Sequence, residues 1–287
     1  MIEKVVYSHW SKPMGEGKGK YVGFNTEQDM IFFAALSVSL SRKWFKEVEL
    51  VTDTYGKELF VDKWKLPFTS VVVALDELEH IDKTHWAIGK LKACSIQTKP
   101  FMHQDMDVFW FKKPPGFVLN ADAAFQNPEM HEVIHSVYKP FILHARKHFK
   151  KPKPFISYDQ IRAVNCGIMA FNEASLPIFK DLYEHALEYI EYYDSSGDDM
   201  PNRNWNLSSL VFEQVHIYWF LFNAGIDIVY LSNDDDYQWV TEDRAKELGY
   251  THTISNSKRL PSTLKKVMKK LSLINPELFK DVLLSKK

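Results

Sequence analysis

The order of strand-like and helix-like segments in the first half of the chain constrains the fold most. Short runs of β-branched and apolar residues alternate with longer stretches whose apolar residues recur at helical spacing. This alternation predicts a parallel, doubly wound sheet with helices on its faces. In chain order, the expected segments are strands at residues 4–8, 48–52 and 69–75 and helices at residues 30–40, 55–65 and 86–97.

The second half of the chain is less regular and shows no convincing domain boundary. Its expected segments are strands at residues 101–111, 121–126 and 163–171, helices at residues 176–193 and 207–224, and a final buried strand at residues 226–231. We therefore expect one domain, residues 1–257, followed by a helical tail, residues 258–287.

Composition excludes several classes of protein. Of the 287 residues, 45% are apolar and 25% are charged, which excludes intrinsic disorder. The formal net charge of −1 argues against a nucleic-acid partner. The N-terminus lacks a signal peptide's apolar stretch, and no segment approaches the roughly 20 apolar residues of a membrane span. With two cysteines, too few for a disulfide framework, these features predict a soluble, cytoplasmic protein.

Charge is distributed unevenly along the chain. The tail carries nine basic and two acidic residues, a local net charge of +7 that leaves −8 for the rest. Four apolar residues recur at helical spacing among its lysines: Leu264, Val267, Met268 and Leu271. The tail is expected to be either a solvated helix or a surface for anionic lipid or phosphate. The second alternative would place the protein peripherally at the inner face of a membrane.

The sharpest local feature is the segment FMHQDMDVF at residues 101–109. Two carboxylates, Asp105 and Asp107, lie two residues apart and can converge on one divalent cation. Oxygen ligands favour Mg²⁺ or Mn²⁺. Acidic pairs are usually solvated, but here unpaired charge would lie within an apolar, aromatic run, where it is costly. The surroundings therefore favour a metal site.

With this D-x-D motif the sequence resembles nucleotide-sugar glycosyltransferases of the GT-A fold. The segment NCGIMAFN at residues 165–172 is similar to a strand that such enzymes place after the D-x-D. The segment HTISNSK at residues 252–258 is similar to the closing H-x-x-G-x-x-K of glycogenin-like and bacterial lipopolysaccharide galactosyltransferases, with Ser255 in place of the glycine. The Glu-Gln pair at residues 213–214 opens a helix where those enzymes carry an acidic residue followed by Gln. The four motifs occur in the expected order.

The resemblance implies a mixed GT-A sheet flanked by helices and a metal-dependent hexosyltransferase. Asp105 and Asp107 would hold Mn²⁺ or Mg²⁺, and His252 would add a nitrogen ligand that favours Mn²⁺. The cation would neutralise the departing diphosphate of the donor, a UDP-sugar, and Lys258 would meet the same diphosphate. Without the two aspartates, His252 and Lys258 would be an ordinary loop histidine and the start of the basic tail. The acceptor stays open: a glycan, a lipid-linked glycan, a peptide and a small molecule all fit.

Three further residues are implied as contacts of the donor. Lys90 lies on a predicted helix fifteen residues before Asp105, where GT-A enzymes often carry a base that touches donor phosphate or sugar. An exposed helical lysine is the equally weighted alternative. Asn165 and Gly167 belong to the similar strand that follows the D-x-D.

The ends of the first two strands are the other expected donor contacts, because parallel sheets bind ligands beyond the carboxyl ends of their strands. Thr52 and Asp53 follow the second strand and are expected to receive the base or ribose. Tyr7 and Trp10 hold the equivalent place after the first strand, where an aromatic ring can stack on uracil. Strand-end turns are polar in any protein, which is the ordinary explanation for these residues.

Glu213 is the expected catalytic carboxylate, with Gln214 beside it. In a retaining enzyme one of them would face the anomeric carbon opposite the leaving group, and in an inverting enzyme a carboxylate would take the acceptor's proton. Asp159 and Asp199 are alternatives for this role. The glycogenin-like closing motif favours retention.

Two other classes of function compete with a glycosyltransferase. A phosphatase of the haloacid dehalogenase type could use Asp105 and Asp107, but its nucleophile normally ends a continuous apolar strand early in the chain, whereas here His103 and Gln104 interrupt the strand. A non-catalytic carbohydrate-binding protein would account for the 14% aromatic residues.

Overall fold

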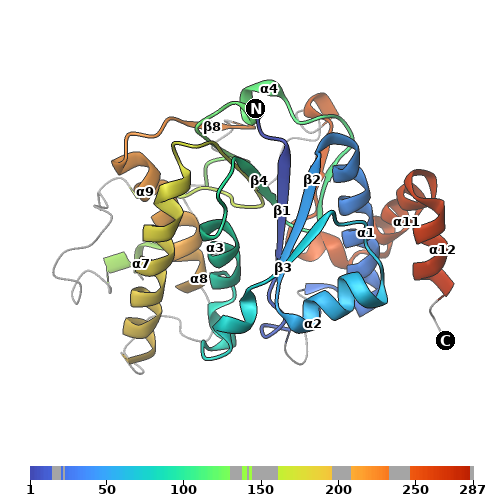
Figure 1. The fold of residues 1–287 in the computed structure, drawn as a ribbon, viewed down its shortest axis with the longest axis horizontal. Coiled ribbons are helices and arrows are strands. Elements are labelled where there is room, and N and C mark those ends of the chain that lie inside the picture. The colour runs from blue at the N-terminus through green and yellow to red at the C-terminus, as the bar shows by residue number, and fades with distance from the viewer. Residues whose placement is uncertain are drawn as a thin grey trace. The chain divides into compact units, whose positions relative to one another are not determined.

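The computed structural model describes residues 1–14, 21, 23–129, 138–140, 142–143, 161–195, 208–232 and 246–284. Seven strands form a mixed sheet in the order β3-β2-β1-β4-β7-β6-β8, and β5 pairs with β9 (Figure 1). The predicted α/β class, a mixed sheet flanked by helices, is confirmed. The strands are β1 (Lys4–His9), β2 (Glu47–Thr52), β3 (Ser70–Val73), β4 (Phe101–Gln104), β5 (Val108–Trp110), β6 (Ala123–Phe125), β7 (Ile168–Phe171), β8 (Ile228–Tyr230) and β9 (Tyr250–His252).

The helices account for most of the other described residues. None of them is long and apolar enough to cross a bilayer in the part of the chain that the structure describes. The α-helices are α1 (Glu27–Trp44), α2 (Thr54–Lys57), α3 (Ile88–Ser95), α4 (Gly116–Leu119), α7 (Leu176–Ser195), α8 (Ser208–Leu210), α9 (Ile217–Asn223), α11 (Pro261–Ile274) and α12 (Pro276–Leu284). Shorter 3₁₀ or π-helical segments are η2 (Glu58–Lys63), η3 (Leu75–Leu78), η4 (Lys83–His85), η8 (Val211–His216) and η9 (Ser255–Arg259).

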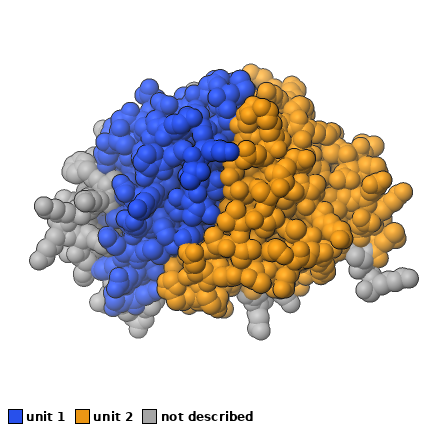
Figure 2. Space-filling view, in the orientation of Figure 1, with its two compact units in different colours: residues 1–2, 84–102, 115–244 blue, residues 3–83, 103–114, 245–287 orange. Residues whose placement is uncertain are grey.

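The described chain divides into two compact units, which Figure 2 colours separately. Unit 1 comprises residues 1–2, 84–102 and 115–244, and unit 2 comprises residues 3–83, 103–114 and 245–287. Each unit is thus built from several chain segments. The domain boundary expected between residues 257 and 258 stays a prediction.

Unit 2 contains the three parallel strands β1, β2 and β3. β1 pairs with β2 from Lys4 opposite Glu47 to His9 opposite Thr52, and β2 pairs with β3 in parallel. α1 begins at Glu27, three residues before the expected start, because the Thr26 side chain accepts a hydrogen bond from the backbone N–H of Asp29 at 3.0 Å and so caps the helix. α1 is buried continuously from Met30 to Ser41, as its largely apolar run requires.

The C-terminal tail also belongs to unit 2. α11 packs on α1, and α12 packs on both helices. Val267 and Leu271 are buried in this contact, whereas the lysines of α11 are exposed. Val267 and Leu271 of the expected apolar stripe therefore serve packing within the protein, whereas Leu264 and Met268 are half-buried, and the surface for anionic lipid or phosphate stays a prediction.

Unit 1 contains β6, β7 and β8, the first half of β4, and the helices α3, α4, α7, α8 and α9. β6 pairs with β7 in antiparallel and with β8 in parallel, which makes the sheet mixed. α3 packs on α7, and the rings of Phe101, Phe171 and Phe179 meet at centroid distances of 4.5 to 6.0 Å. Cys94 and Cys166 are both buried, and no disulfide joins them.

Three segments differ from their expected form. The strand expected over residues 101–111 is broken by a turn at residues 105–107, because the two aspartates leave the ladder there. The strand expected over residues 226–231 is observed as β8, which is half-buried rather than buried. It is also not the last strand, since β9 follows it. Gly249, which has a φ of +73°, directly precedes β9. The helix expected over residues 55–65 begins as α2 and continues as the π-helical segment η2.

Candidate metal and donor site

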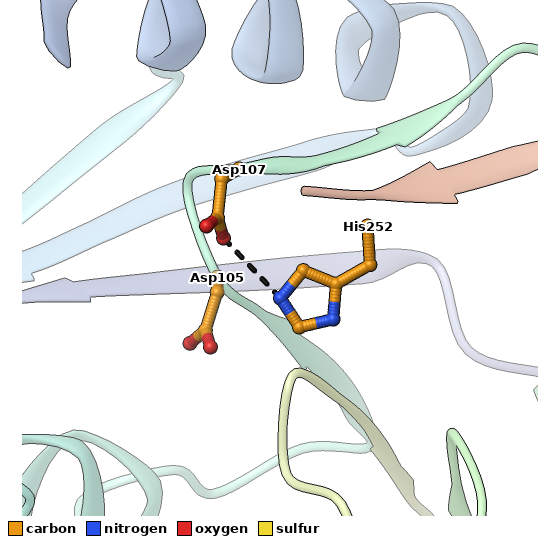
Figure 3. Close-up of side chains that lie close together, drawn as sticks. All are labelled: Asp105, Asp107 and His252. Atoms are coloured by element: carbon orange, nitrogen blue, oxygen red, sulfur yellow. Dashed lines mark ion pairs between the residues drawn. The ribbon is translucent and has the colours of Figure 1, made fainter. Parts of the chain in front are cut away.

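The turn between β4 and β5 presents the two aspartates of the D-x-D motif. The backbone N–H of Val108 donates to the carbonyl of Asp105 at 3.1 Å, which closes the turn around Met106 and Asp107. β5 pairs with β9 so that Val108 lies opposite His252. Figure 3 shows the imidazole of His252 directed toward the Asp107 carboxylate, with 3.4 Å between Nε2 and Oδ1.

Asp105, Asp107 and His252 form a donor set that fits a divalent cation. One ligand atom from each residue lies within 4.8 Å of the other two. Ligands at about 2.2 Å from one ion are separated by roughly 3 to 4.4 Å, so a small adjustment brings the three onto one cation. Two carboxylate oxygens and one imidazole nitrogen are donors that divalent metal ions accept. The structure thus brings together the three residues that were expected as metal ligands.

Lys258 adds a positive charge to this site. Its ammonium lies 2.7 Å from Oδ2 of Asp107 and 5.0 Å from the centre of the Phe24 ring. Burial alone would raise the pKa of the Asp107 carboxyl, but the nearby Lys258 and His252 outweigh burial, and the pKa lies well below its ordinary value. Asp107 is therefore a carboxylate that attracts cations, although it is almost fully buried.

The backbone around Asp107 is also held in place. The carbonyl of Asp107 accepts hydrogen bonds from the backbone N–H of Thr253 at 3.0 Å and from its hydroxyl at 3.2 Å. Lys258 belongs to η9, whose next residue, Arg259, donates from Nε to the carbonyl of Gly23 at 2.7 Å. The two halves of the closing motif thus come from β9 and η9 of one unit.

The residues expected at the ends of β1 and β2 are already engaged by their own chain. Asp53 accepts hydrogen bonds from the backbone N–H and hydroxyl of Ser11, both at 2.6 Å, and from the N–H of Gly56 at 2.8 Å. Thr52 donates from Oγ1 to the carbonyl of His9 at 2.7 Å. Asp53 thereby caps α2 and ties down the loop that follows β1.

The two expected stacking residues, Tyr7 and Trp10, are both buried. Tyr7 has no exposed surface, and its hydroxyl lies 3.0 Å from Ser37 Oγ and 2.8 Å from Ser41 Oγ. Burial raises the pKa of the Tyr7 phenol, against the smaller effect of the two serine hydroxyls. In this arrangement the Tyr7 ring packs in the interior of unit 2, with the Phe68 ring at its edge.

A second group of expected site residues meets inside unit 1. Lys90 donates from Nζ to Oε1 of Glu213 at 2.6 Å and to the carbonyl of Cys166 at 3.1 Å. The Glu213 side chain is 2% exposed and that of Lys90 is 10% exposed, so this is a buried ion pair. Both expectations for Lys90, a donor contact and an exposed lysine, omitted this partner.

Asn165, Gly167 and Gln214 lie around that ion pair. Asn165 accepts from the N–H of Gly167 at 3.0 Å, and its amide lies 3.4 Å from Glu129 Oε1. The hydroxyl of Tyr138 donates to Oε1 of Gln214. Glu213 and Gln214 lie on the π-helical segment η8, a form of helix that recurs at functional sites.

Some residues of these clusters were missed or fall outside the described chain. Sequence reasoning missed Glu129 and Tyr138 because neither belongs to a recognisable motif. Sequence reasoning also gave Gln104 no role in the site. A polar residue within β4 could have indicated one, because that strand is fully buried. The alternative carboxylates Asp159 and Asp199 lie outside the described residues.

Comparisons with known proteins identify the family of the chain. Residues 3–284 match the family described as a family of unknown function, DUF6734, and the chain belongs to that family. No curated protein matches the chain. Among solved structures, the apo form of mouse xyloside xylosyltransferase 1 aligns with a TM-score of 0.43 and 13% identity, covering 90% of this chain and 99% of that chain.

Proposed function

We propose that the protein is a metal-dependent glycosyltransferase of the GT-A type that moves a sugar from a nucleoside diphosphate, a UDP-sugar, to an acceptor. The reaction breaks the bond between the anomeric carbon and the diphosphate oxygen and forms a bond from that carbon to an acceptor oxygen. The acceptor's proton leaves to a base. The leaving diphosphate gains negative charge in this step, so the site must supply positive charge.

The convergence of Asp105, Asp107 and His252, with Lys258 beside them, is the observation that carries this proposal. These residues would hold Mn²⁺ or Mg²⁺, and the cation would act as a Lewis acid on the leaving diphosphate. Lys258 would supply a second positive charge to the same phosphates. Four residues drawn from two distant motifs meet in one place, which an incidental acidic turn would not require.

We propose Glu213 as the catalytic carboxylate, with Gln214 beside it. The ammonium of Lys90 at 2.6 Å favours the ionised form of Glu213, which is the form needed by a base or a nucleophile. In this proposal Lys90 pairs with the Glu213 carboxylate instead of contacting the donor, whereas Asn165 and Gly167 would contact the donor. We assign retention of anomeric configuration to the reaction, and the configuration of the product, measured by proton NMR, tests it.

This proposal gives an indirect role to the four residues that were expected to contact the base or ribose: Thr52, Asp53, Tyr7 and Trp10. Their side chains are buried and three of them are hydrogen-bonded within the protein. We therefore propose that they shape the loops at the ends of β1 and β2, where the base and ribose would lie, through backbone groups.

The direct test is a screen of UDP-, GDP- and CMP-sugars for donor hydrolysis in the presence and absence of Mn²⁺. We expect hydrolysis of a UDP-sugar that depends on Mn²⁺, together with UDP binding by calorimetry that also depends on Mn²⁺. Failure of UDP to bind when Mn²⁺ is present would contradict the proposal and favour a non-catalytic carbohydrate-binding protein.

A pair of variants ties the activity to the site. Asp107→Ala removes one metal ligand, and Asp62→Ala removes an exposed carboxylate that pairs with Lys57 on the surface. We expect Asp107→Ala to lower the rate at least about 100-fold and Asp62→Ala to leave it unchanged. A folded Asp107→Ala protein with full activity would remove the metal site from the reaction. Release of phosphate from an aryl phosphate, unaffected by UDP, would favour a phosphatase instead.

A further inference from the structure

The D-x-D turn is flanked on both sides by one buried polar network. Gln104 precedes the turn and is 1% exposed; its Nε2 donates to the hydroxyl of Tyr7 at 2.7 Å and to Ser37 Oγ at 3.0 Å. Val108 follows the turn, and its carbonyl accepts from Ser37 Oγ at 2.6 Å. The residue before and the residue after the two aspartates are therefore joined through the same serine.

The protons in this network can be assigned from its geometry. Ser37 has one hydroxyl proton and donates it to the Val108 carbonyl, so Ser37 must accept from its other partners. Tyr7 accepts from Gln104 and donates its own proton to Ser37 or to Ser41. Each hydroxyl thus has a donor and an acceptor role, which makes the network directional and rigid.

We infer that Gln104, Tyr7 and Ser37 are positioning residues of the metal site, which they hold by fixing both ends of the Asp105–Asp107 turn to β1 and α1. The inference rests on the proposed function, because it assumes that the turn binds a cation. Residues outside the ligand shell that orient metal ligands typically change metal affinity by about 10- to 100-fold when they are altered.

The location of the network argues for this role over a purely structural one. Three polar side chains lie in an interior formed by β1, α1 and β4, where apolar residues would pack without any need for hydrogen bonds. Their hydrogen bonds converge on the one place where the chain leaves the sheet and returns. A network that only filled the core would not need to end on the Val108 carbonyl.

The test measures Mn²⁺ binding to the full chain by isothermal titration calorimetry. Gln104→Met keeps the size of the side chain but removes its donors, and Tyr7→Phe removes only a hydroxyl. The matched control is Thr69→Val, which removes a hydroxyl bonded to the backbone of Val48 in the same unit. Circular dichroism melts show that each variant is folded.

We expect Gln104→Met and Tyr7→Phe to raise the dissociation constant for Mn²⁺ about 10-fold or more. Thr69→Val should leave that constant within about 2-fold of its value in the unaltered protein. If the unaltered protein binds Mn²⁺ and all three variants bind it equally well, the inference is overturned while the proposed function stands. If the unaltered protein does not bind Mn²⁺, the metal site and the inference fail together. Should Gln104→Met not fold, Tyr7→Phe decides between these outcomes.

Discussion

At the scale of single residues, Lys90 and Glu213 place two opposite charges in the interior of unit 1. Glu213 and Lys90 form a buried ion pair in which each side chain compensates the other for part of its lost hydration. Removing one member of such a pair leaves an uncompensated charge in the interior, whereas replacing both with apolar residues is often neutral. The ion pair can therefore be tested through stability, independently of any activity.

We predict that Lys90→Met lowers the free energy of unfolding by about 3 kcal/mol, because it strands the Glu213 carboxylate. The double variant Lys90→Met, Glu213→Leu should recover most of that loss. Lys92→Met is the matched control: Lys92 lies over the Tyr183 ring at 5.3 Å, a contact worth about 1 kcal/mol or less. Urea denaturation measures the free energy of unfolding of all three variants. A double variant that is no more stable than Lys90→Met would contradict the prediction.

At the scale of elements, the junction between β2 and α2 leaves no room for a side chain at one position. Gly56 lies in the first turn of α2, below the Asp53 cap. A Cβ there would lie 2.0 Å from Thr52 Oγ1, 3.0 Å from His9 Cδ2 and 3.1 Å from Asp53 Oδ1. The strand, the cap and the helix are thus packed so closely that a Cβ on residue 56 would force a neighbouring group, first of all the Thr52 hydroxyl, to shift.

We predict that Gly56→Ala lowers the free energy of unfolding by about 1 to 3 kcal/mol, as overpacking does. Gly116→Ala, in the short helix α4, is the control because the nearest atom to its Cβ lies 3.8 Å away. There we expect no loss, or a gain of up to about 1 kcal/mol from the lower entropy of the unfolded chain. Equal effects of the two substitutions on thermal unfolding would show that the junction is not tightly packed.

For the whole molecule, buried histidines make stability depend on pH. Burial lowers the pKa of His9 to about 4 despite the opposing effect of Asp53, and burial lowers the pKa of His185 to about 4 as well. The pKa of His216 lies well below its ordinary value because of burial and the neighbouring His185. These three histidines are therefore harder to protonate in the folded protein than in the unfolded chain.

The sign of the effect follows from this difference. Above about pH 6.5 both states leave the histidines neutral, and stability is highest; as the pH falls from 6.5 toward 4, protonation favours the unfolded chain. We predict that His9 and His185 together lower the free energy of unfolding by about 3 kcal/mol between about pH 7.5 and about pH 5.5. Asp107 acts in the same direction only below about pH 4, where its carboxylate would be protonated in the unfolded chain.

Urea denaturation at the two pH values measures this loss. His185→Phe should reduce the measured loss, to which His216 also contributes, by about 1.4 kcal/mol, whereas His80→Gln, at an exposed position, should leave it unchanged. A free energy of unfolding that stays constant from neutral pH to about pH 5.5 would contradict burial of these two histidines in their neutral form.

The basic tail leads to a further whole-molecule prediction. The apolar side of α11 is packed on α1, so its exposed lysines can attract a membrane electrostatically but the stripe cannot insert. We expect weak binding to vesicles that contain phosphatidylserine and none to phosphatidylcholine vesicles, with each lysine near the surface worth about 1 kcal/mol. Binding should be lost at about 1 M salt, where charges are screened beyond about 3 Å.

Co-sedimentation with vesicles measures this binding. Replacing Lys265, Lys266, Lys269 and Lys270 by Gln should abolish it without changing the fold. Binding that persists at high salt would indicate inserted apolar side chains and would require α11 to leave α1.

Much of the fold could be predicted from sequence because its signals are local. The β-branched runs of β1 and β2, the Thr26 cap and the helical periodicity of α7 each depend on neighbouring residues in the chain. The candidate metal ligands could also be located from the sequence, since the D-x-D and the closing His-to-Lys segment are short motifs. Their convergence required β9, whose three residues are too few to show a strand pattern.

The sequence by itself therefore determined the order of elements and the chemical identity of the candidate site. Only the tertiary structure decided which partner each polar side chain has. Lys90 could have been an exposed lysine or a donor contact, and Tyr7 a stacking platform; burial instead paired Lys90 with Glu213 and Tyr7 with Gln104 and the serines of α1. The physical reason is that a charge or hydroxyl taken out of water must find its partner in space, and that partner lies far away along the chain.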